Sequence, residues 1–84
     1  MIEEINEPID MIAVFNDGAT RPLRFRWANR VYHVKRVTGI WRTREGSYEH
    51  LNYSLMTRES ADCFEISFDG RLFAWTLDRI HIPG

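Results

Sequence analysis

The chain has 84 residues, of which 44% are hydrophobic and 27% charged, and its formal net charge is −1. This length suits one domain and is too short for a TIM barrel, a complete dinucleotide-binding fold or a kinase, and the apolar content excludes a disordered chain. A single cysteine excludes an internal disulfide bond, and no apolar run is long enough for a membrane-spanning helix, so we expect a soluble, cytoplasmic protein.

The charges are distributed unevenly along the chain. Residues 1–20 contain five acidic residues and no basic one, whereas residues 21–44 contain eight basic residues and no acidic one. Residues 45–84 are acidic again, with seven acidic and three basic residues. Because binding responds to local potential, the basic block is compatible with an anionic partner. Alternatively, acidic strands pair beside basic strands and the charges cancel.

The N-terminal part of the chain predicts a short acidic segment followed by a strand. Apolar residues alternate instead of recurring at helical spacing, which is typical of strands. Residues 1–8 are expected to form a flexible acidic N-terminus. The first strand is predicted from Ile9 to Asn16, and Asp17-Gly18 is predicted to close it with a turn.

A second strand is predicted from Leu23 to Trp27, and Ala28-Asn29 is expected to form a two-residue hairpin loop after it. The resulting register pairs Phe25 with Tyr32, Leu23 with Val34, and Arg24 with His33. The first two pairs are apolar and share one face, and the opposite face is basic. This agreement between pairing and polarity supports the hairpin.

The third strand is predicted from Val31 to Thr43, with a bulge or bend near Gly39. Glu45-Gly46 is expected to turn the chain into a fourth strand, Ser47 to Met56. That register pairs Ile40 with Leu51, and Arg42 with Glu49.

The last hairpin is predicted around Asp69-Gly70, which is a preferred two-residue loop between alternating strands. Its register pairs Ile66 with Phe73, and Phe64 with Trp75. The preceding segment, Thr57 to Ala61, is compatible with either a loop or a single helical turn.

Together these elements predict an all-β single domain over residues 9–80, followed by a C-terminal tail over residues 81–84. About six antiparallel strands in a meander would form a strongly bent sheet or a small open barrel. The predicted core consists of Phe25, Tyr32, Val34, Ile40, Leu51, Tyr53, Phe64, Ile66, Phe73 and Trp75.

The basic block provides the candidate binding surface. Guanidinium groups can donate two parallel hydrogen bonds to a phosphate, and exposed aromatic rings beside them can stack on bases. Trp27, Tyr32 and Trp41 are interleaved with the basic residues. The candidate nucleic-acid-binding residues are Arg24, Arg26, His33, Lys35, Arg36, Arg42 and Arg44.

A second candidate surface is the interaction patch formed by Trp41, Tyr48 and His50, because exposed aromatic side chains dominate protein interfaces. Alternatively, these residues close a second small core or are covered by the N-terminal segment. We predict no catalytic residue, metal site or cofactor. The three histidines fall on separate elements, and no glycine-rich phosphate loop or nucleophile elbow is present.

The aromatic and turn residues also carry a resemblance over roughly residues 9–80. The pattern consists of Pro22, Phe25-Arg-Trp27, Tyr32-His-Val34 and Trp41, followed by a closing hairpin from Cys63 to Ile80. It resembles a family of small uncharacterised bacterial domains, some of whose relatives are associated with Y-family translesion DNA polymerases. The resemblance implies the fold, supplies no catalytic residue, and connects the chain to DNA repair only by association.

We therefore expect a non-enzymatic module that binds nucleic acid with weak sequence specificity, DNA being favoured over RNA, in a role accessory to DNA repair or translesion synthesis. The alternative is a protein-interaction or self-association module that uses the aromatic patch or a sheet edge and has no nucleic-acid role. The chain is expected to be a monomer or a homodimer without membrane contact. Whether the acidic N-terminus covers the basic face is left open.

Overall fold

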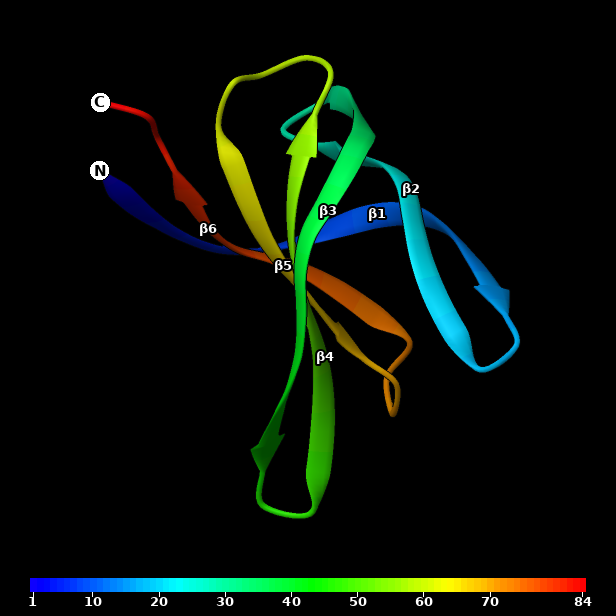
Figure 1. Cartoon of the computed structure of the whole chain (residues 1–84). Helices are drawn as coiled ribbons and strands as arrows, with labels where there is room; N and C mark the ends of the chain where they lie inside the picture. The colour runs from blue at the N-terminus through cyan, green and yellow to red at the C-terminus, as the bar shows by residue number, and fades with distance from the viewer.

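The computed structural model describes residues 1–84 and consists of six antiparallel strands and no α-helix. The strands are β1 (Ile2–Asn16), β2 (Ala19–Trp27), β3 (Arg30–Glu45), β4 (Tyr48–Thr57), β5 (Cys63–Asp69) and β6 (Ala74–His81). They pair in chain order, and β1 also pairs with β6, so that the ring of strand pairing closes (Figure 1). The predicted all-β meander of six antiparallel strands is confirmed. No helix able to cross a membrane is present.

The N-terminal segment belongs to the sheet. The expectation of a flexible segment over residues 1–8 is wrong, because β1 begins at Ile2 and its first half pairs with β6. A bulge between Glu4 and Glu7 accommodates Asn6 in a left-handed conformation, with φ of 54°. The backbone of Met1 also exchanges hydrogen bonds with Ile82, just beyond β6, so both chain ends are held together.

The first two turns follow the local sequence. Asp17-Gly18 and Ala28-Asn29 each form a two-residue loop, and all four residues have positive φ, as a type I′ turn requires. The predicted pairs of the second hairpin, Phe25 with Tyr32 and Arg24 with His33, are confirmed. The predicted pair of Leu23 with Val34 does not form, because the β2–β3 ladder ends at Arg24 and His33.

Strands β3 and β4 form a long two-stranded arm that projects beyond the rest of the sheet (Figure 1). Its loop is Gly46-Ser47 rather than Glu45-Gly46, so the predicted pairs are wrong by two residues. The observed register pairs Ile40 with Tyr53, Arg42 with Leu51, and Arg44 with Glu49. Bulges interrupt the ladder after Val34 and after Val37, and the second confirms the irregularity predicted near Gly39.

The β5–β6 hairpin also differs from its prediction. Residues 70–73 form a four-residue loop, because Asp69 Oδ1 accepts hydrogen bonds from the backbone nitrogens of Arg71 and Leu72 at 2.9 and 3.4 Å. As a result, Phe68 lies opposite Trp75, and Phe73 is left in the loop with 77% of its surface exposed. The wider loop keeps the apolar faces of β5 and β6 aligned while excluding Phe73 from the core.

The core fills the inside of the bent sheet. Its eleven buried hydrophobic residues are Ile9, Phe25, Tyr32, Tyr53, Leu55, Phe64, Ile66, Phe68, Trp75, Leu77 and Ile80. Six predicted core residues are confirmed: Phe25, Tyr32, Tyr53, Phe64, Ile66 and Trp75. Val34 and Leu51 are only partly buried against the core. Ile40 is 62% exposed, because β2 does not pair with β3 beyond His33 and leaves this part of β3 without a neighbouring strand on one edge, and it is a second error beside Phe73.

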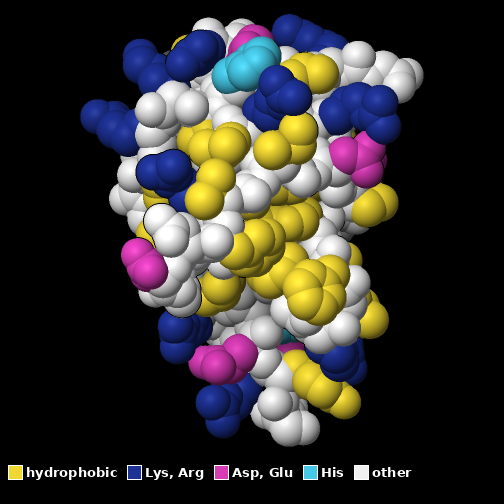
Figure 2. Space-filling model, turned by 90° about the vertical axis from the view of Figure 1, so that its right-hand side faces the viewer, with side chains coloured by type: hydrophobic (Ala, Val, Ile, Leu, Met, Phe, Trp, Pro, Cys, Tyr) yellow, Lys and Arg dark blue, Asp and Glu magenta, His cyan; other side chains and the backbone are white.

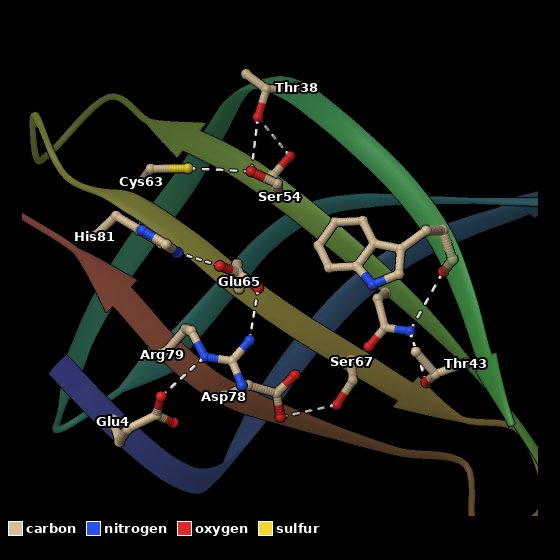
Figure 3. Close-up of polar contacts among 12 residues, drawn as sticks. Glu4, Thr38, Thr43, Ser54, Cys63, Glu65, Ser67, Asp78, Arg79 and His81 are labelled. Atoms are coloured by element: carbon tan, nitrogen blue, oxygen red, sulfur yellow. Dashed lines mark hydrogen bonds and ion pairs between the residues drawn. The ribbon is translucent and has the colours of Figure 1, made fainter. Parts of the chain in front are cut away.

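A chain of polar contacts joins β1, β5 and β6 where the ring closes (Figure 3). Arg79 donates hydrogen bonds to Glu4 on β1 at 3.1 Å and to Glu65 on β5 at 2.7 Å. Glu65 is also hydrogen-bonded to His81. Partial burial alone would raise the pKa of Glu65, but the hydrogen bonds from His81 and Arg79 outweigh it and hold that pKa below its ordinary value.

Replacing Glu65 by glutamine is expected to lower the free energy of unfolding by about 1–2 kcal/mol near neutral pH. Because the folded pKa is depressed, the stabilising contribution of Glu65 is present above its ordinary value of 4.5 and is lost as the pH falls through the folded pKa. The stability difference between parent and E65Q proteins should therefore shrink below about pH 4. Urea denaturation across the acid range measures it, and a difference independent of pH would contradict this role for the carboxylate.

Candidate nucleic-acid interface

The outer side of β1, β2 and β3 carries part of the predicted basic face. Arg24 and Arg26 alternate with the buried Phe25, so both side chains point outward. Two shallow hollows of about 350 and 480 Å³ cover this side, and they share Ile12 and Arg24 as lining residues. They therefore form one continuous concave surface rather than two separate sites.

Two of the predicted residues on this side already have acidic partners. Arg26 lies 2.6 Å from the Asp10 carboxylate, but both side chains are largely exposed, so this pair contributes at most about 1 kcal/mol to stability. His33 contacts Glu59 through two atoms, with its ring Nδ1 at 2.6 Å and its backbone nitrogen at 2.7 Å from the two carboxylate oxygens. The hydrogen bond with the His33 ring is the main reason that the pKa of Glu59 is lowered. His33 thus holds the β4–β5 loop in place.

The next basic residues lie at the first bulge of β3. Lys35 and Arg36 are exposed and line a hollow of about 450 Å³ together with Ser60 and Ala61 of the β4–β5 loop. Arg58, in the same loop, lines the hollow that contains Arg24, and its backbone nitrogen donates to the carbonyl of His33 at 3.0 Å. We call these five exposed cations the basic surface: Arg24, Arg26, Lys35, Arg36 and Arg58.

Arg58 is a residue that the sequence reasoning missed. It lies outside the basic block, in the segment that was compatible with either a loop or a helical turn. Only the hydrogen bonds of this loop to His33 bring it beside Arg24, and these contacts span 25 residues or more of sequence. The composition of the segment contains no signal for that placement.

Arg42 and Arg44 do not join the basic surface, which corrects that part of the prediction. The bulge after Val37 inserts one residue into β3 and reverses the alternation of its faces. Consequently Arg36 and Trp41 share the outer side, whereas Arg42 and Arg44 face the other way on the projecting arm. Arg44 also lies 4.0 Å from Glu49 across the ladder.

Of the three aromatic residues interleaved with the basic block, only Trp41 presents its ring on the outer side of β3. Tyr32 is buried in the core, and Trp27 is partly buried with its Nε1 donating to Glu7 at 2.8 Å. Trp41 is 39% exposed, and its ring lies against Gly39, where an added Cβ would be 3.7 Å from the indole. The exposed Trp41 ring therefore provides a flat aromatic surface on the same strand and the same side as Arg36.

The predicted interaction patch of Trp41, Tyr48 and His50 does lie on one side of the arm, but it is not a continuous apolar surface. The guanidinium of Arg71 covers the Tyr48 ring at 3.7 Å, and His50 Nε2 lies 3.8 Å from the Glu45 carboxylate. The alternative of a second small core is not observed, since Trp41 and Tyr48 are exposed.

A polar hollow of about 540 Å³ adjoins this patch on the outer side of β3–β6. Its lining residues include Asn52, Ser67 and Asp78, and the Ser67 hydroxyl donates to Asp78 at 3.1 Å (Figure 3). Partial burial raises the pKa of Asp78. Sequence reasoning missed these residues because polar residues at outward strand positions are common and carry no specific signal.

No family model, curated protein or solved structure matches this chain. The resemblance to the bacterial domain family and its polymerase association therefore stays a prediction.

Proposed function

We propose that this chain is a non-enzymatic module that binds nucleic acid, with DNA favoured over RNA and with weak sequence specificity. The observation that carries the proposal is the basic surface, on which Arg24, Lys35, Arg36 and Arg58 are exposed and have no acidic partner. Figure 2 shows Lys and Arg side chains gathered over one end of the molecule, with few acidic side chains among them.

The chemistry of this surface favours a phosphate backbone. Guanidinium groups donate paired hydrogen bonds to phosphate oxygens, and Lys35 adds a point charge beside Arg36. Such contacts hold a strand without reading its sequence. Trp41 lies on the same side of β3 and would stack on an unpaired base, so a single strand should bind better than a duplex.

A role accessory to DNA repair or translesion synthesis is part of the same proposal. Its support is the resemblance to domains associated with Y-family polymerases, together with a binding mode that tolerates any sequence. The acidic N-terminus does not argue against this role, because its residues from Ile2 to Pro8 pair with β6 rather than crossing the basic surface.

Titration with oligonucleotides while tryptophan fluorescence is recorded tests the proposal. Single-stranded DNA should quench the fluorescence of Trp41, and the logarithm of affinity should fall with the logarithm of salt concentration with a slope of about −3 if four phosphates are contacted. Absence of binding at low salt would overturn the proposal.

Charge reversal identifies the surface that binds. The double variant Lys35→Glu/Arg36→Glu is expected to weaken binding at least about tenfold and to reduce the salt slope. The matched control is Arg42→Glu/Arg44→Glu, which makes the same charge change on the other side of β3 and should bind nearly as the parent does. Equal losses in both variants would mean that overall charge, not this surface, determines binding.

A further inference from the structure

The polar hollow of about 540 Å³ lies in the same row of the sheet as the exposed Trp41 ring. Trp41 of β3 is paired with Asn52 of β4, and Asn52 is paired with Ser67 of β5. Ser67 is in turn paired with Thr76 of β6. Residues directly opposite one another share a face, so these four side chains form one row on the outer side, and the last three line the hollow. The backbone of Trp41 is about 4.8 Å, one strand spacing, from the row position of Asn52.

Asn52 presents an unpaired acceptor to this hollow. The residue is only 8% exposed, and its amide nitrogen donates to the backbone carbonyls of Trp41 and His50 and to the Thr43 hydroxyl. Because a carbonyl oxygen can only accept, these contacts fix the orientation of the amide. None of the hydrogen bonds of Asn52 involves its Oδ1. A buried polar side chain with an unpaired oxygen is satisfied by a donor from a ligand.

The Asp78 carboxylate is a second acceptor in the hollow. Its Oδ1 accepts the Ser67 hydroxyl at 3.1 Å, and its Oδ2 has no hydrogen-bond partner (Figure 3). The neighbouring Arg79 does not neutralise it, because that guanidinium pairs with Glu4 and Glu65. Three acidic residues and one arginine line the hollow. It therefore repels a phosphate group and favours a neutral group that donates hydrogen bonds.

Guanine is the base whose donors match these acceptors. Its Watson–Crick edge presents N1–H and the N2 amino group side by side, and one carboxylate can accept from both. Adenine and cytosine present one amino group beside a ring nitrogen that accepts, and thymine presents a single N–H between two carbonyls. Those acceptors would face the carboxylate without a shared proton. The hollow is therefore complementary to guanine among the four bases.

We propose that the hollow holds the base next to the one that stacks on Trp41, and that it selects guanine. The Asp78 carboxylate accepts from N1–H and from the N2 amino group, and Asn52 Oδ1 accepts the remaining amino hydrogen. The inference rests on the proposed function, because the phosphate contacts of the basic surface bring the strand to Trp41. It adds one preferred position to binding that is otherwise independent of sequence.

Fluorescence anisotropy with labelled single strands of about nine nucleotides tests this preference. One strand contains thymine throughout, and two others carry a single central guanine or inosine among thymines. The guanine strand should bind at least about tenfold more tightly than the thymine strand. Inosine has the purine ring system of guanine but lacks the N2 amino group, so its strand should lose most of this gain. Equal affinities of the guanine and inosine strands would overturn the proposal.

The variant Asp78→Asn locates the preference in the hollow. The preference for guanine over inosine should fall below about twofold, because an amide offers one acceptor and turns its own N–H groups toward the guanine donors. The matched control is Asp17→Asn, which makes the same charge change in the β1–β2 turn, outside the hollow, and should keep the preference. A preference retained in Asp78→Asn, or lost equally in both variants, would overturn the proposal. The ratio is measured within each protein, so a general change of affinity does not affect it.

Failure of this inference and failure of the proposed function give different results. If all three strands bind equally and with the expected salt dependence, the basic surface binds nucleic acid and the hollow does not distinguish bases. If no strand binds at low salt, the proposed function fails and this inference fails with it.

Discussion

Replacing Phe68 by alanine is expected to lower the free energy of unfolding by about 3–5 kcal/mol, whereas Phe73→Ala should change it by no more than about 0.5 kcal/mol. Phe68 is 7% exposed. The centroid of its ring lies 4.8 Å from the ring centroid of Trp75 and 5.9 Å from that of Phe15. Phe73 is mostly exposed in the β5–β6 loop. A domain of this size has a stability of about 4–12 kcal/mol, so loss of Phe68 removes a large part of it.

The pair of variants tests the register of the last hairpin. In the register predicted from Asp69-Gly70 alone, Phe73 would lie in the core opposite Ile66, and its loss would be the costly one. Urea denaturation followed by circular dichroism gives both free energies, and each variant is the control for the other because the same atoms are removed. A larger loss for Phe73→Ala would show that the two-residue loop is the correct one.

The turns differ in how well the local sequence predicts the length of the loop. The loops at Asp17-Gly18 and Ala28-Asn29 were predictable, since both are two-residue loops whose length depends only on the positive φ of their own residues. At Asp69-Gly70 the same dipeptide rule fails, because the Asp69 side chain accepts two backbone hydrogen bonds and stabilises a wider loop. Both registers place apolar residues on one face, so polarity could not distinguish between them.

The candidate site was predictable only where the strand alternation is regular. Arg24 and Arg26 share a face because β2 alternates strictly there, whereas Lys35 and Arg36 lie at the first bulge of β3, where both are exposed. Beyond the second bulge of β3 the alternation of side chains is reversed, so Arg42 points to the side opposite to the predicted basic face. A glycine suggests that a bulge is present. The side of the sheet that the following residues face depends on whether the bulge inserts one extra residue, and the sequence alone does not indicate this.

Long-range pairing was the other source of error, and it produced the largest one. Acidic residues near a chain end are typical of a solubilising tail, yet here Glu4 and Glu7 each have a partner far along the chain, Arg79 and Trp27. The apolar Ile5 between them packs against the core. Glu4 and Arg79 are more than 70 positions apart in the sequence, and no local sequence pattern predicts their contact.

Removal of the segment before Ile9 is therefore expected to cost about 3 kcal/mol or more, and to leave much of the protein unfolded or self-associated at physiological temperature. The shortened chain loses the β1–β6 ladder over residues 2–8, the Glu4–Arg79 ion pair and the cover that Ile5 gives to the core. It also leaves the edge of β6 unpaired, and an unpaired edge promotes association between chains.

The matched control keeps the strand and removes only its charge. The triple variant Glu3→Gln/Glu4→Gln/Glu7→Gln neutralises the acidic residues of this segment, and its stability should stay within about 1–2 kcal/mol of the parent, because exposed ion pairs contribute little. Thermal unfolding and size-exclusion chromatography of the three proteins separate the two effects. If the shortened chain unfolds at the same temperature as the parent and stays monomeric, residues 1–8 are a tail after all. A loss shared equally by the triple variant would instead assign the effect to charge. Loss in the shortened chain alone means that the acidic segment is the strand that closes the sheet through its pairing with β6.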